Sequence, residues 1–128
     1  MKSWVFVYLL FMSVSASAAD LNDIYKHLDI TSFNSSLRPM QTDNERFLPE
    51  VSQLPSPIIK NNEIRIEDEY WIYSIKVMRE NKLDIHICFL DVSKDGTYDT
   101  QGPMIIRKYG QEYVAISSKT DVCDSYKK

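Results

Sequence analysis

The chain has 128 residues, of which 44% are hydrophobic and 26% charged, and its formal net charge is −3. This length is typical of one small domain. A mildly acidic chain without a basic stripe excludes nucleic acid and anionic membranes as expected partners.

The first eighteen residues have the pattern of an export signal. Lys2 precedes the nine apolar residues "WVFVYLLFM", and small residues follow at Ala16 and Ala18, as a signal peptidase requires. The apolar run is about half of the roughly 20 residues that a membrane-spanning helix needs. We expect cleavage after Ala18, giving a periplasmic or secreted protein without a membrane span. Because Lys2 is the only charge removed, the mature chain would carry −4.

The remaining residues 19–128 are expected to form a single domain that begins with a short helix. Apolar residues recur at helical spacing, and Asp20 precedes them as a suitable N-cap. The apolar stripe consists of Leu21, Ile24, Tyr25 and Leu28. A helix of eight residues is not stable alone in water, so we expect it to dock on a sheet.

Residues 29–62 predict an irregular but ordered arm, which together with the helix forms the 19–62 part of the domain. The segment has many Ser, Asn and Gln residues and no sustained period, yet it is too apolar for a free linker. Its prolines are Pro39, Pro49, Pro55 and Pro57. We expect this Pro-rich arm to lie across the sheet.

From residue 63 to 128 the alternating pattern indicates strands joined by short connections. The expected strands are "EIRIE", "YWIYSIKVM", "LDIHICFLDV", "PMIIRKY" and "EYVAISS". Short connections favour antiparallel neighbours. The predicted fold class is α+β, with the helix and arm packed on a roughly five-stranded antiparallel meander sheet.

Two cysteines, Cys88 and Cys123, are the only ones in the chain. In an exported protein they are expected to form a disulfide. By the chain-entropy model, this cross-link contributes about 3–4 kcal/mol to stability.

The stretch "DVSKDGTYD" has oxygen-bearing side chains at alternate positions, which suggests a calcium loop. Asp91, Ser93, Asp95 and Asp99 match an EF-hand, but Gly102 stands where the bidentate Glu belongs. Strands rather than helices are also expected on both sides. We favour a turn between two strands and expect no cofactor, with a weak calcium site as the alternative.

Asp84, His86 and Cys88 alternate on one predicted strand and have the composition of a thiol hydrolase. Residues two apart on a strand lie too far from each other for catalytic contact, and a disulfide-bonded Cys88 offers no thiolate. His27, the other histidine, has no metal-binding spacing. We therefore expect a protein that is not an enzyme.

An acidic run, Glu67, Asp68 and Glu69, and the aromatic residue Tyr98 are candidate contacts for a protein partner. A cationic hydrolase would suit this acidity. The leading hypothesis is an exported protein-binding protein, namely an inhibitor or immunity protein against a cell-wall-active enzyme. The alternative is a small-molecule or calcium-binding module without catalysis.

Overall fold

A computed structural model describes residues 19–37 and 45–124. The predicted signal peptide, residues 1–18, lies outside these ranges, as does Pro39 of the arm. Among the described residues, no helix has the length and apolar character to cross a bilayer. The helical elements are α1 (Leu21–His27), η1 (Ile30–Ser32) and η3 (Leu48–Glu50). The strands are β1 (Leu28–Asp29), β2 (Ile58–Lys60), β3 (Glu63–Glu67), β4 (Trp71–Glu80), β5 (Ile85–Ser93), β6 (Asp99–Tyr109) and β7 (Glu112–Ser117).

The prediction of a five-stranded antiparallel meander is wrong. In the described part of the chain, seven strands form one mixed sheet in the order β1-β7-β6-β5-β4-β3-β2. β1 pairs with β7 in parallel, Leu28 opposite Tyr113, while the other pairs are antiparallel. The protein is mostly β, and the α+β class fits it only loosely.

The two unpredicted strands are too short to show a period. β1 has two residues and directly follows α1, so its pattern merges with that of the helix. β2 lies within the Pro-rich arm and has three residues, which pair with β3 across a turn at Asn61 and Asn62. Both asparagines have positive φ, at 53° and 61°, as a type I′ hairpin turn requires.

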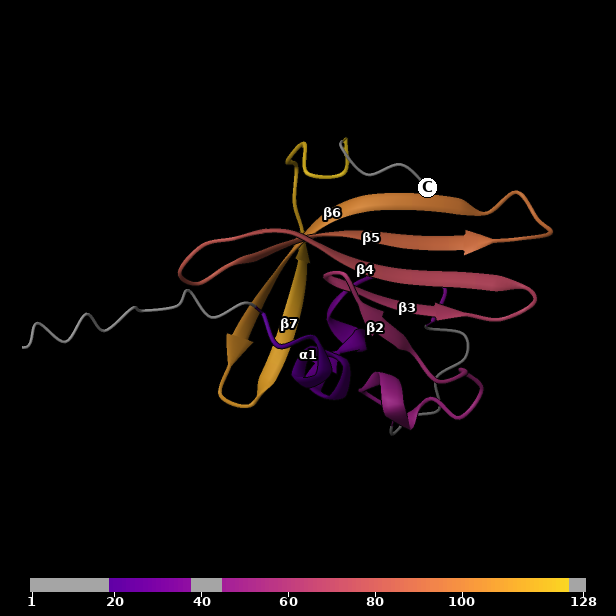
Figure 1. Cartoon of the computed structure of the whole chain (residues 1–128), viewed down its shortest axis with the longest axis horizontal. Helices are drawn as coiled ribbons and strands as arrows, with labels where there is room; N and C mark the ends of the chain where they lie inside the picture. The colour runs from indigo at the N-terminus through magenta and orange to yellow at the C-terminus, as the bar shows by residue number, and fades with distance from the viewer. Residues whose placement is uncertain (1–18, 38–44, 125–128) are drawn as a thin grey trace, which may run out of the picture.

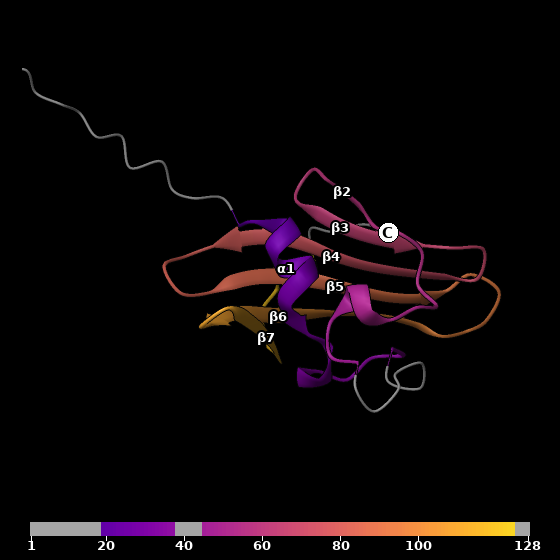
Figure 2. The same cartoon turned by 90° about the horizontal axis from the view of Figure 1, so that it is seen from below.

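The sheet bends into a half-barrel, and α1 lies against its concave face (Figures 1 and 2). The helix contacts β3, β7 and η3, so it bridges distant strands of the bent sheet. Asp20 caps it by accepting the backbone N–H of Asp23 at 3.1 Å. Ile24 faces inward and is fully buried.

The main core lies between this concave face and the helix and arm. The strands contribute alternate residues, as expected for a sheet with one covered face. They are Leu28, Ile64, Ile66, Tyr73, Ile75, Ile87, Phe89, Met104, Ile106, Tyr113 and Ala115. The arm contributes Phe33, Leu37, Leu48 and Val51. Such an arm is part of the core and is not a linker.

The C-terminal segment lies on the side of the sheet away from α1 (Figure 1). The Cys88–Cys123 disulfide joins it to β5, with 5.2 Å between the Cα atoms. The backbone N–H of Ser118 donates to the carbonyl of Pro103 on β6 at 3.0 Å. Val122 is buried there, apart from the main core. The predicted disulfide is confirmed.

Candidate functional site

A carboxylate is buried at one end of the half-barrel, among polar and aromatic side chains. Asp91, on β5, is 1% exposed. Its Oδ1 accepts hydrogen bonds from the indole N–H of Trp71 and the hydroxyl of Ser36, both at 2.6 Å. Its Oδ2 accepts from the backbone N–H of Ser36 at 2.8 Å and, at 3.5 Å, from the hydroxyl of Tyr98. Asp91 thus ties the arm to two hairpins of the sheet.

The register of β4 and β5 brings Asp91 into this network. Asp91 lies opposite Tyr73 on β4, so both side chains point to the concave face. The hydroxyl of Tyr73 contacts that of Ser36 at 2.9 Å. Burial raises the pKa of Tyr73 to about 12, so its phenol stays neutral and able to form this hydrogen bond at physiological pH.

Three aromatic residues that we call the aromatic tip, Tyr70, Trp71 and Tyr98, lie beside this network. The ring centroids of Trp71 and Tyr98 are 5.5 Å apart, within the range of favourable aromatic pairs. Tyr70 is 64% exposed and Tyr98 is 43% exposed. Two large aromatic side chains therefore face solvent at the end where a third, Trp71, is held by Asp91.

A hollow of about 250 Å³ opens beside the aromatic tip. We call it the tip pocket. It is lined by Gln53, Leu54, Asp68, Tyr70, Trp71 and Tyr73. The residues before β2 and the β3–β4 turn therefore enclose it together.

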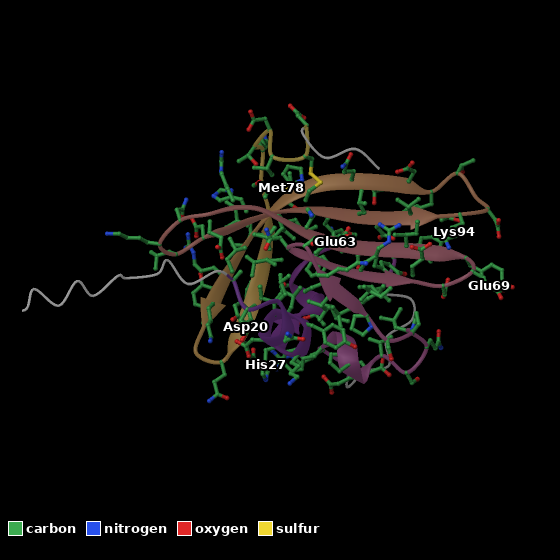
Figure 3. All side chains as sticks on the ribbon, viewed as in Figure 1. Asp20, His27, Glu63, Glu69, Met78 and Lys94 are labelled. Carbon is green, nitrogen blue, oxygen red and sulfur yellow. A yellow bond between two sulfur atoms is a disulfide. The ribbon has the colours of Figure 1, made fainter. Side chains whose placement is uncertain are left out.

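The β3–β4 turn fixes the shape of the aromatic tip. Oδ1 of Asp68 accepts the backbone N–H groups of Tyr70 and Trp71, at 2.7 and 2.8 Å. The carbonyl of Tyr70 accepts the backbone N–H of Lys94, at 2.9 Å, from the neighbouring β5–β6 hairpin. The two hairpin tips are thus joined, and Glu69 and Lys94 lie at the same end of the sheet (Figure 3).

The predicted partner residues Glu67, Asp68, Glu69 and Tyr98 all lie at this end. Glu67 is bound by Lys94 at 2.7 Å and by Arg65 at 2.8 Å; the Lys94 hydrogen bond is the main cause that lowers its pKa. Within the described ranges, no ion pair involves Asp68 or Glu69. These two carboxylates carry the charge that is open to a partner.

The candidate calcium ligands do not converge. Asp91 turns into the concave face, whereas Asp95 is exposed and Ser93 Oγ accepts the backbone N–H of Gly96 at 3.0 Å. Asp99 begins β6 and lies opposite Val92. The residues that the structure describes contain no group of three or more His, Cys, Asp or Glu side chains placed to hold a metal.

The Asp84–His86–Cys88 trio does not form a catalytic arrangement. Oδ1 of Asp84 is bound by Arg107 at 2.7 Å, and Cys88 is in the disulfide. Nδ1 of His86 is buried without a hydrogen-bond partner in the described part of the chain. His27 contacts Asp23 within α1 at 2.9 Å.

A second hollow, of about 400 Å³, lies at the opposite end of the half-barrel. Asp23 and Lys108 help to line it, and Asp23 already accepts a 2.7 Å hydrogen bond from Tyr113. Lys108 contacts the same carboxylate at 3.4 Å. The lining also includes Asp20, Glu80 and Lys82, so this hollow presents charges of both signs rather than a single acidic patch.

Comparison with known proteins gives no relatives. No family model matches the chain, and neither a curated protein nor a solved structure matches it. The site must be interpreted from its own chemistry.

Ser36, Trp71 and Tyr73 were not predicted as site residues. The Tyr70-Trp71 pair directly after an acidic run was a usable signal, because aromatic residues beside charge are typical of interfaces. No local signal marked Ser36, because its contact with Asp91 spans 55 residues of sequence.

Proposed function

We propose that the protein is an exported, periplasmic or secreted protein that binds a basic partner protein through its aromatic tip. The role that suits it best is an inhibitor or immunity protein against a cationic, cell-wall-active enzyme. One observation carries the proposal: Tyr70 and Tyr98 are exposed beside Trp71, next to the carboxylates of Asp68 and Glu69.

The composition of this surface supports binding rather than catalysis. Tyr and Trp are enriched among residues that dominate interface energies, because they bury a large area with little loss of side-chain entropy. Acidic groups around such a patch raise the association rate with a cationic protein. The internal hydrogen bonds of Asp91 and Asp68 keep the aromatic tip in place before binding, which reduces the ordering cost.

Affinity capture at low ionic strength tests the proposal. The immobilised 19–128 chain should retain a basic protein from extract of the source organism's cell envelope, and salt should release it. Tyr70→Ala and Tyr98→Ala should lose the partner, whereas Tyr109→Ala should keep it. Tyr109 is a matched control because it is 54% exposed and lies at the end of β6 far from the aromatic tip.

The captured protein should also lose its enzymatic activity when the wild-type chain is added. Retention of no basic protein, or equal retention by all three variants, would contradict the proposal. Mass spectrometry of exported material tests the export step. The measured mass should be that of a chain that begins at Ala19 and contains the disulfide.

A second candidate function is small-molecule binding without catalysis, which the tip pocket favours. Its volume of about 250 Å³ is slightly below the usual range of about 300–1,000 Å³ for ligand sites, so any such ligand would be small. Calorimetric titration with small aromatic and cationic compounds tests this alternative. A binding heat that the wild-type chain shows and the Tyr70→Ala variant does not would support this alternative.

A further inference from the structure

We infer that the tip pocket receives a single arginine or lysine side chain of the partner, an inference that rests on the proposed function and narrows it. The observations are the size of the pocket, its aromatic walls and its uncompensated negative charge. None of them alone defines a ligand, but together they select one chemical class.

The size of the hollow suits one long side chain. Its volume of about 250 Å³ is slightly below the range of about 300–1,000 Å³ for small-molecule sites. Leu54 forms an apolar part of its wall, suited to the aliphatic stem of a long basic side chain.

The aromatic walls suit a cation. Tyr70 and Trp71 line the pocket, and the face of an aromatic ring attracts a guanidinium or ammonium group, most strongly in Trp. The indole N–H of Trp71 is held by Asp91 at 2.6 Å. This hydrogen bond fixes the ring plane before the ligand arrives and places a carboxylate at the ring edge.

The charges select a cation over a neutral group. Asp68 lines the pocket, and its Oδ1 is used only by two backbone N–H groups. Two basic side chains at this end of the sheet, Lys94 and Arg65, are bound by Glu67. A basic side chain would therefore complete the local charge balance.

Fluorescence of the 19–128 chain provides the test, since Trp71 is its only tryptophan. N-acetyl-arginine N-methylamide and its lysine equivalent should change Trp71 emission saturably. The citrulline analogue, which has a similar shape without the charge, should bind at least about fivefold more weakly. Equal binding of arginine and citrulline derivatives, or no saturable change, would overturn the inference.

Two pocket variants and one control variant test whether the arginine derivative binds in the tip pocket. Asp68→Asn keeps the oxygen that caps the turn but removes the charge, so it should weaken the arginine derivative by about three- to tenfold. Tyr70→Leu should weaken it similarly, and Tyr109→Leu should leave it unchanged. Circular dichroism confirms that each variant is folded. Unchanged affinity in both pocket variants would overturn the inference.

The two proposals fail in different ways. If a basic protein binds Asp68→Asn as tightly as the wild-type chain but is lost by Tyr98→Ala, the pocket inference is wrong and the proposed function stands. If the arginine derivative binds but no basic protein does, the cation site is supported and the proposed partner is wrong.

Discussion

Trp71 and Asp91 are joined by a 2.6 Å hydrogen bond between an indole N–H and a carboxylate that is 1% exposed. They come from neighbouring strands, and the same carboxylate accepts two hydrogen bonds from Ser36 of the arm. The bond therefore links the arrangement of the arm to the position of Trp71 in the aromatic tip.

Replacing Asp91 by Asn should destabilise the protein by about 1–3 kcal/mol. The neutral amide accepts more weakly and turns an N–H₂ group toward a donor of Ser36, which leaves buried polar groups unsatisfied. Urea unfolding of the 19–128 chain measures the loss of stability. Asp95→Asn, four residues further along the chain but exposed, should change stability by no more than about 0.5 kcal/mol. Equal effects of the two variants would show that the network is unimportant.

Calcium should leave the melting temperature unchanged at millimolar concentration. Both oxygens of the Asp91 carboxylate are engaged within the protein, and the other candidate ligands point elsewhere. Differential scanning calorimetry with calcium and with a chelator checks this. A rise in melting temperature that Asp99→Asn abolishes would establish a calcium site instead.

Reducing the disulfide should lower the free energy of unfolding by about 3–4 kcal/mol, because Cys88 and Cys123 are separated by 35 residues. Urea unfolding with and without dithiothreitol gives the difference. The double variant Cys88→Ala/Cys123→Ala is the control and should not respond to the reductant. A wild-type chain equally stable in both conditions would refute the stabilising role.

Stability should decrease in acid partly through Asp23. The hydrogen bond from Tyr113 is the largest cause that lowers the pKa of Asp23 in the folded protein. The unfolded chain, with an Asp pKa of about 3.9, then binds the proton more readily. The contribution is therefore complete above the unfolded pKa and is lost as the pH falls through the folded pKa.

The Tyr113→Phe variant tests this directly. Removing the hydroxyl should raise the pKa of Asp23 toward its ordinary value, as measured by NMR titration of the side-chain carboxyl. It should also reduce the loss of stability between pH 5 and low pH, because the folded and unfolded pKa values of Asp23 then differ less. An unchanged Asp23 pKa in this variant would contradict the assignment.

The sequence predicted the elements that carry a clear period. The stripe Leu21–Leu28 with Asp20 as cap lies where α1 forms, and the alternating runs after Glu63 lie where β3 to β7 form. β1 was not predicted because its two residues show no alternation. Its parallel partner strand, which contains Tyr113, is also far away in sequence. β2 was not predicted because it directly follows Pro55 and Pro57, although Asn61-Asn62 was a usable turn signal.

The site could be predicted only in part for a similar reason. The acidic run at Glu67 to Glu69 and Tyr98 stood out by composition alone. The burial of Asp91 did not, because alternation along "DVSKDGTYD" suits a loop as well as a strand end. The register of β4 and β5 places Asp91 beside Trp71, and Ser36 reaches Asp91 from the arm across 55 residues of sequence, so no local pattern encodes this contact.

The aromatic tip is proposed to bind a basic protein. Amide NMR of the isotope-labelled 19–128 chain, titrated with a panel of basic cell-wall hydrolases, tests this residue by residue. We expect at least one hydrolase to shift the signals of residues 67–71 and 94–98 while those of 80–83 and 108–112 stay in place. No shifts with any hydrolase, or shifts confined to 80–83 and 108–112, would contradict it.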